Sequence, residues 1–155
     1  MDSGEFGPGI EKGLNFLIKF GNALSKEAKK MDTEYSPKGS GNIVVLIQNS
    51  DPEAIYFGLL YALRAAKNQW MDNVKVVFWG PAEKTICGLP PDSEQIKLLK
   101  EIQAMGGKSG SVWACKACSD RYGITQNMLD LGFEVFHTGE ATSYLLKSGY
   151  VIWNW

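Results

Sequence analysis

From Asn42 to the carboxyl terminus, short apolar runs alternate with segments of helical periodicity, and this alternation most constrains the fold. Each run is short, and the first is a continuous, mainly β-branched run, as is typical of a strand buried on both faces of a sheet. The runs span residues 43–47, 74–79, 111–114, 133–137 and 150–153. Because strands separated by helices form parallel sheets through right-handed crossovers, the sequence predicts an α/β fold. We expect a three-layer α/β/α sandwich around a five-stranded parallel sheet.

Capping and breaking residues mark the helices between these runs. Asp51-Pro52-Glu53 is typical of a helix start and predicts a helix that continues through Ala66, with Trp70 near its end. A helix capped by Asp92 or Ser93 is expected to bury Met105 near its end. Residues 82–91, which end in Pro90-Pro91, are predicted to form a loop that carries Cys87. Further helices are predicted over residues 115–122, 125–129 (capped by Thr125) and 140–147.

The first 41 residues have a different pattern. Apolar side chains over residues 10–31 fall on one stripe of an amphipathic helix, which we expect to pack against the body of the protein. A membrane-surface helix and an oligomer contact are the alternatives, and a polar face of mixed charge without Arg argues against the membrane. Residues 32–41 are rich in Ser, Pro and Gly and predict a flexible connector. The predicted division is therefore 1–41, helix and connector, and 42–155, the α/β domain.

Composition and charge exclude several classes of function. Sixteen Lys and Arg against 17 Asp and Glu give a net charge of -1, so no overall field favours nucleic acid or an anionic membrane. No apolar run approaches the ~20 residues needed to cross a bilayer, and the amino terminus lacks a signal-peptide pattern. Three cysteines are too few for the disulfide framework of a secreted domain. We therefore expect a cytoplasmic protein without membrane or nucleic-acid partners.

The chemistry-bearing residues follow the predicted strands. Carboxyl ends of parallel strands share one edge of the sheet, where ligand sites gather. Cys115 follows the third strand, and Cys118 comes three residues later. A helix start and the neighbouring Lys116 favour a thiolate at Cys115. His137 is either a proton shuttle near the thiol or an ordinary strand-end residue. Asn49, Trp79 and Lys116 are expected to be substrate contacts at this edge, with packing the alternative for Trp79.

The Cys-x-x-Cys spacing is compatible with several chemistries. Zinc would need two further ligands, and the chain offers only Cys87 and His137 without a second close pair, so we predict no metal. A thioredoxin-like motif would need antiparallel strands, which the alternating pattern does not provide. A Cys115/Cys118 redox pair and simple burial of both thiols stay open. No glycine-rich nucleotide fingerprint is present, and we predict no cofactor.

Several motifs together resemble the DsrE/DsrF-like family of small sulfur-carrier proteins. They are the order of elements from Asn42 to Trp155, the turn Asn49-Ser50-Asp51 after the first strand, and Cys115 followed eight positions later by Gly123-Ile124. The closing pattern is also similar, with Gly139, Leu145-Leu146 and Tyr150-Val-Ile-Trp153. The resemblance covers about three quarters of the chain and leaves out the amino-terminal helix.

This resemblance implies a sulfur carrier or sulfurtransferase that accepts sulfane sulfur on Cys115, as a persulfide or thiosulfonate, and passes it to a partner in a sulfur relay. The implied partners are sulfur donor and acceptor proteins, and relatives form homotrimers or hexamers. Many relatives lack a cysteine at the position of Cys118, which is therefore a resolving thiol, an assisting thiol or a packing residue. A non-catalytic assembly or regulatory module of the same fold, and a Cys115/Cys118 dithiol redox protein, are the alternative functions.

Overall fold

The computed structural model describes residues 40–155 and, from the preceding segment, residues 18–19, 22–23 and 26. The chain divides into two compact units, Met1–Lys38 and Gly39–Trp155. The five described residues of the first unit are helical, and the rest of the helix predicted over residues 10–31 lies outside the described residues. The predicted domain boundary after residue 41 stays a prediction.

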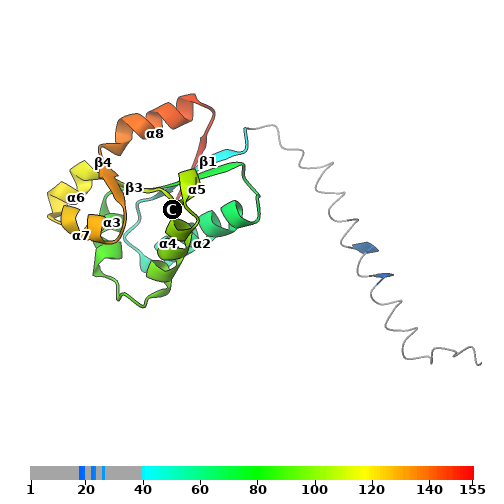
Figure 1. Ribbon diagram of the computed structural model, residues 1–155, viewed down its shortest axis with the longest axis horizontal. Coiled ribbons are helices and arrows are strands. Elements are labelled where there is room, and N and C mark those ends of the chain that lie inside the picture. Colours follow the sequence, from blue (N-terminus) through cyan, green and yellow to red (C-terminus); the bar gives the residue numbers. More distant parts are fainter. Residues whose placement is uncertain (1–17, 20–21, 24–25, 27–39) are drawn as a thin grey trace, which may run out of the picture. The chain divides into compact units, whose positions relative to one another are not determined.

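The second unit contains a five-stranded, fully parallel sheet in the order β4-β3-β2-β1-β5 (Figure 1). The predicted α/β class and parallel sheet are therefore confirmed. β5 pairs with β1 instead of β4, so β1 lies between β2 and β5 and the strand order reverses there. The carboxyl ends of β1 and β5 therefore form the switch point, which is where sheets of this kind bind ligands. The strands are β1 (Asn42–Ile47), β2 (Asn73–Phe78), β3 (Val112–Cys115), β4 (Glu134–Phe136) and β5 (Val151–Asn154).

Helices cover both faces of this sheet. The main core lies on one face, where Ile55 and Leu59 of α2 and Leu99 of α4 pack with the strands. A smaller core on the other face joins Val77 to Leu145 of α8. Figure 1 shows α8 on the opposite side of the strands from α2 and α4. The helices are α2 (Pro52–Lys67), α3 (Pro81–Gly88), α4 (Glu94–Ala104), α5 (Gly107–Gly110), α6 (Lys116–Tyr122), α7 (Thr125–Asp130) and α8 (Thr138–Lys147).

The prediction of a loop over residues 82–91 is wrong, because the first part of this segment belongs to helix α3. Pro81 occupies the first turn, where a missing N–H costs nothing. Ala82 and Ile86 lie four residues apart and are both buried, which is the spacing of one helix face. The pair Pro90-Pro91 lies beyond the end of this helix. The correction matters for function, since α3 carries residues that contact the cysteines.

Other helix ends differ by smaller amounts. The Asp51 side chain accepts the Glu53 N–H at 3.0 Å, as predicted for the cap of α2. The cap predicted at Thr125 is wrong, because Ile124 is the capping residue and the Thr125 hydroxyl donates to Asp120 at 2.6 Å. Met105 was expected to be buried but is 37% exposed, because α4 ends one residue earlier and Met105 is its C-cap.

Candidate functional site

The two cysteines of the Cys-x-x-Cys motif lie where β3 meets α6. Cys115 is both the last residue of β3 and the N-cap of α6, and Cys118 follows in the first turn of that helix. Both side chains are half-buried. Gly123 ends α6 with φ of 66°, a left-handed conformation that favours glycine. The motif is therefore a short strand-to-helix junction at the carboxyl edge of the sheet, as the sequence predicts.

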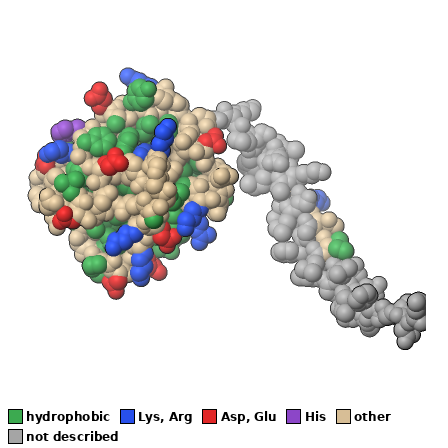
Figure 2. All heavy atoms as spheres, in the orientation of Figure 1, with side chains coloured by type: hydrophobic (Ala, Val, Ile, Leu, Met, Phe, Trp, Pro, Cys, Tyr) green, Lys and Arg blue, Asp and Glu red, His purple; other side chains and the backbone are tan. Residues whose placement is uncertain are grey.

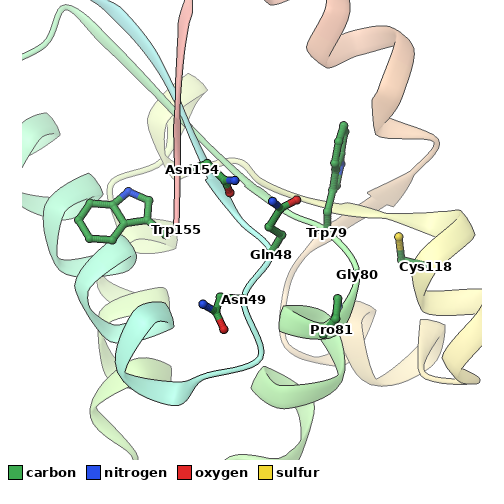
Figure 3. Close-up of a pocket in the computed structure, with 8 residues that line it drawn as sticks. All are labelled: Gln48, Asn49, Trp79, Gly80, Pro81, Cys118, Asn154 and Trp155. Atoms are coloured by element: carbon green, nitrogen blue, oxygen red, sulfur yellow. The ribbon is translucent and has the colours of Figure 1, made fainter.

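An open cavity of about 500 Å³ lies at this edge, beside the switch point between β1 and β5. Figure 3 shows Cys118 on one side of it and Trp155 on the other, with Gln48 and Trp79 between them. Residues from the ends of three strands and from the start of α3 line the cavity together with Cys118; they include Gln48, Asn49, Trp79, Pro81 and Trp155. The cavity is large enough to admit a small molecule or an extended segment of a partner protein.

Cys118 is the thiol that lines this cavity, and its environment keeps it protonated. Burial raises the pKa of Cys118 to about 11, and hydrogen bonding to the Cys115 side chain, the charge on that sulfur and the charge of Glu83 act in the same direction. A backbone hydrogen bond from Gly80 opposes this shift. At neutral pH Cys118 therefore carries its proton, and the sulfur of Cys115 is its immediate neighbour.

Glu83 lies in the first turn of α3, and its side chain is fully buried (0% exposed). One carboxyl oxygen, Oε1, accepts the backbone N–H of Cys115 at 2.8 Å. The other, Oε2, is buried and has no hydrogen-bond partner among the described residues. Burial raises the pKa of Glu83 from 4.5 to about 7, although the hydrogen bond from Cys115 opposes this shift. A carboxyl that titrates near neutral pH thus lies directly against the Cys115 backbone.

Sequence reasoning missed Glu83 because it placed this residue in a loop. A helix starting at Pro81 would have put Ala82, Glu83 and Ile86 on one face, and all three are buried. That spacing was the available signal.

Cys87 lies on the same helix but faces a different neighbour. Its Sγ donates to Met128 Sδ at 3.2 Å. Burial and the charge of Glu83 raise the pKa of Cys87 to about 11. This thiol is therefore protonated at neutral pH and packed between α3 and α7.

Lys116 and His137 both lie near Asp120. Lys116 Nζ forms an ion pair with the Asp120 carboxylate, one turn along α6. Hydrogen bonds from Lys116 and then from Thr125 lower the pKa of Asp120, and the charge of His137 acts in the same direction. His137 is exposed and caps the start of α8. The predicted roles of Lys116 and His137 beside the thiolate stay predictions.

Asn49 and Trp79 both line the cavity, and each already makes an internal hydrogen bond. Asn49 Oδ1 accepts the Asp51 N–H at 3.0 Å, and Trp79 Nε1 donates to Thr138 Oγ1 at 2.7 Å. These bonds fix both side chains at the cavity wall. Their predicted role as substrate contacts stays a prediction.

The place of Trp155 at the cavity wall was not anticipated from the sequence. Its carbonyl accepts the backbone N–H of Gln48 at 3.0 Å and of Asn49 at 3.1 Å. The end of the chain is thus fastened to the segment that follows β1 and forms a cavity wall. No local signal marks this role, since it depends on β5 pairing with β1.

Figure 2 shows acidic and basic side chains interspersed on the visible face. Within residues 40–155 and the five described residues before them, no group of three His, Cys, Asp or Glu side chains is arranged to hold a metal ion. The same part of the chain contains no helix long and apolar enough to cross a membrane.

These features define a parallel α/β domain with a thiol pair at the carboxyl edge of its sheet. The model of the DsrE/DsrF-like family matches residues 42–153, and the chain belongs to this family. The family is associated with sulfur relay between partner proteins.

One solved structure is similar in fold, that of a conserved protein of unknown function from Bacteroides thetaiotaomicron. The two sequences are 20% identical, and the TM-score is 0.60 over 77% of this chain and 100% of that one. At this identity the similarity supports the fold alone. No curated protein matches the chain.

Proposed function

We propose that this protein is a sulfur carrier that accepts sulfane sulfur as a persulfide on Cys115 and passes it to a partner protein. The observation that carries the proposal is the position of Cys115, a half-buried thiol that ends β3 at the carboxyl edge of the sheet and is the N-cap of α6. Cys118 lies in the first turn of α6, and burial raises its pKa to about 11, so we assign Cys115 as the sulfur that reacts and Cys118 as the assisting thiol. Membership of a sulfur-relay family supports the same assignment.

The chemistry needs no cofactor. The Cys115 thiolate attacks the outer sulfur of a donor persulfide, a new S–S bond forms, and the donor leaves as a thiolate. The acceptor thiolate then attacks the same outer sulfur, and Cys115 is released. The outer sulfur passes between thiols without net oxidation, so the cycle is closed without an external oxidant or reductant.

The cavity provides the surface that a donor or acceptor would contact. Asn49 and Trp79 lie at its wall, and we assign to them the contacts with the sulfur-bearing segment of the partner. Lys116 and His137 lie with Asp120 on the α6 side, where they would contact the approaching protein. Three free cysteines are consistent with a reducing compartment such as the cytoplasm.

Self-association is part of the proposal. The edge strand β5 exposes Val151 (56%) and Trp153 (47%), and Tyr144 of the neighbouring helix α8 is 71% exposed. Large apolar side chains gathered on an edge strand favour a contact with a second copy. A homotrimer or hexamer would cover them.

Replacing Cys115 with serine is expected to abolish sulfur loading. The reduced protein is incubated with polysulfide or thiosulfate, freed of reagent and analysed by intact and peptide mass spectrometry. The wild type should gain mass in steps of one sulfur atom on Cys115, and sulfite should leave when thiosulfate is the donor. Cys87→Ser is the matched control, because this thiol packs against Met128 away from the cavity, and it should load like the wild type. Added mass that persists in Cys115→Ser contradicts the proposal.

The Cys-x-x-Cys arrangement at the start of α6 also favours a second candidate, a dithiol redox protein. In that case polysulfide would leave no sulfur on the protein. It would instead produce a Cys115–Cys118 disulfide, seen as the loss of the two thiol hydrogens. The same mass spectra therefore separate the two functions.

A further inference from the structure

The start of α3 lies beside both residues of the thiol pair. Gly80, which caps this helix, lines the cavity together with Cys118. Three residues later, Glu83 Oε1 accepts the backbone N–H of Cys115 at 2.8 Å. The Glu83 carboxyl is thereby held against the residue whose sulfur we propose to react.

The surroundings of this carboxyl are unusual for a structural residue. Its side chain is fully buried, Oε2 has no hydrogen-bond partner among the described residues, and no cation there forms an ion pair with it. Its charge acts on two thiols, Cys118 on α6 and Cys87 on α3, and its contact with Cys115 is through the backbone N–H. Burying a carboxyl without a counter-charge is costly.

Structure alone does not require an acid at this position. The bond from the Cys115 N–H needs only a carbonyl oxygen, which the amide of glutamine would supply with nearly the same shape. What the carboxyl adds is the ability to bind and release a proton. Burial shifts this ability toward neutral pH, since the pKa of Glu83 is raised to about 7, and groups that titrate in this range are suited to moving protons in catalysis.

We propose that Glu83 is the proton acceptor for sulfur loading, taking the thiol proton when Cys115 attacks the donor and returning it when the sulfur leaves. The inference rests on the proposed carrier function of Cys115. Because Oε1 is held by the Cys115 N–H, Oε2 is the oxygen that carries the proton.

The proposed cycle balances. On loading, the Cys115 proton moves to the Glu83 carboxylate, the S–H electron pair forms the bond to the donor's outer sulfur, and the donor thiolate leaves with the pair of the broken S–S bond. On unloading, an acceptor thiolate takes the outer sulfur, and the departing Cys115 sulfur recovers the proton from the Glu83 carboxylic acid. The net change is the transfer of one sulfur atom from donor to acceptor.

The test compares single-turnover loading by polysulfide, followed by mass spectrometry, in the full-length wild type and in Glu83→Gln. The polysulfide ionises in the same way in both experiments, so the ratio of the two loading rates measures the effect of the substitution alone. A positioned base contributes about 10²- to 10⁴-fold, and we expect Glu83→Gln to load at least about 10²-fold more slowly near pH 8. The ratio of the wild-type rate to the Glu83→Gln rate should approach one near pH 10, where thiols ionise without help. The same ratio should also decrease when the pH is lowered below about 7, because Glu83 becomes protonated.

Two further variants control the comparison. Glu83→Asp keeps an acid but shortens the side chain, so it should load at a rate between those of the wild type and Glu83→Gln. The ratio of its loading rate to that of Glu83→Gln should also rise around neutral pH. Glu53→Gln changes an exposed first-turn glutamate of α2 and should load like the wild type. Circular dichroism and thermal melting establish that each variant is folded at each pH.

A rate ratio of one between the wild type and Glu83→Gln at every pH overturns the proton-acceptor role and leaves the carrier function intact. The role is also overturned if a constant slowing at all pH values is found in both Glu83→Gln and Glu83→Asp, because that pattern marks a purely structural residue. A wild type that does not load at all contradicts the carrier function itself, which is a separate outcome.

Discussion

Glu83→Gln is expected to remove a pH-dependent loss of stability of about 3 kcal/mol from the fold. The pKa of Glu83 is raised from 4.5 to about 7 by burial, so between these values the folded protein binds the proton more tightly than the unfolded chain. Stability therefore falls as pH rises from about 4.5 to about 7 and is level above pH 7. Each unit by which the pKa differs between the folded and unfolded states changes the free energy of unfolding by about 1.4 kcal/mol. The amide does not titrate, and the variant should lack this fall.

Urea unfolding at about pH 5 and about pH 8 measures the difference. The wild type should lose stability between the two values relative to Glu83→Gln, so that the variant gains most at the higher pH. Glu53→Gln is the matched control, since its side chain is exposed, and its profile should parallel that of the wild type. Parallel profiles for wild type and Glu83→Gln contradict the burial of an ionisable carboxyl at this position.

Phe78→Ala is expected to destabilise the fold by about 3 to 5 kcal/mol, the usual cost of removing a buried aromatic ring. Phe78 is the last residue of β2, is fully buried, and packs edge-on against Phe133 with ring centroids 5.1 Å apart. A domain of this size has a total stability of about 5 to 15 kcal/mol. The substitution therefore removes a large share of it.

The urea midpoint of Phe78→Ala, with its m-value, measures this loss. Phe57→Ala provides the comparison, because Phe57 lies on α2 and is 49% exposed, and surface changes of this kind usually alter stability by less than about 1 kcal/mol. Equal losses in the two variants would mean that Phe78 is not a core residue.

The strands and the thiol pair were accessible from the sequence because their signals are local. Residues 43–47 form one apolar run and are all buried, as expected for a strand covered on both faces. Cys115 falls at the end of its strand because an apolar run stops there. The order of strands is not local: the pairing of β5 with β1 joins segments about a hundred residues apart, and with it the position of Trp155 at the cavity could not be predicted.

Helix α3 shows why the rest of the site was missed. It has eight residues, too few for a clear apolar period, and Pro90-Pro91 shortly after it is a strong breaking signal. With α3 taken as a loop, Glu83 had no assigned face. Its burial follows from packing of α3 against the rest of the domain, and the proximity of its carboxyl to Cys115 depends on the register between α3 and β3.

Transfer of sulfur from Cys115 is tested most directly by cyanide, which removes sulfane sulfur from a persulfide as thiocyanate. The protein is loaded with polysulfide, separated from the reagent, and treated with cyanide. The wild type and Cys87→Ser should each release a near-equimolar amount of thiocyanate and return Cys115 to the free thiol, whereas Cys115→Ser should release almost none. Equal release from Cys115→Ser and the wild type would contradict the assignment of Cys115 as the sulfur carrier.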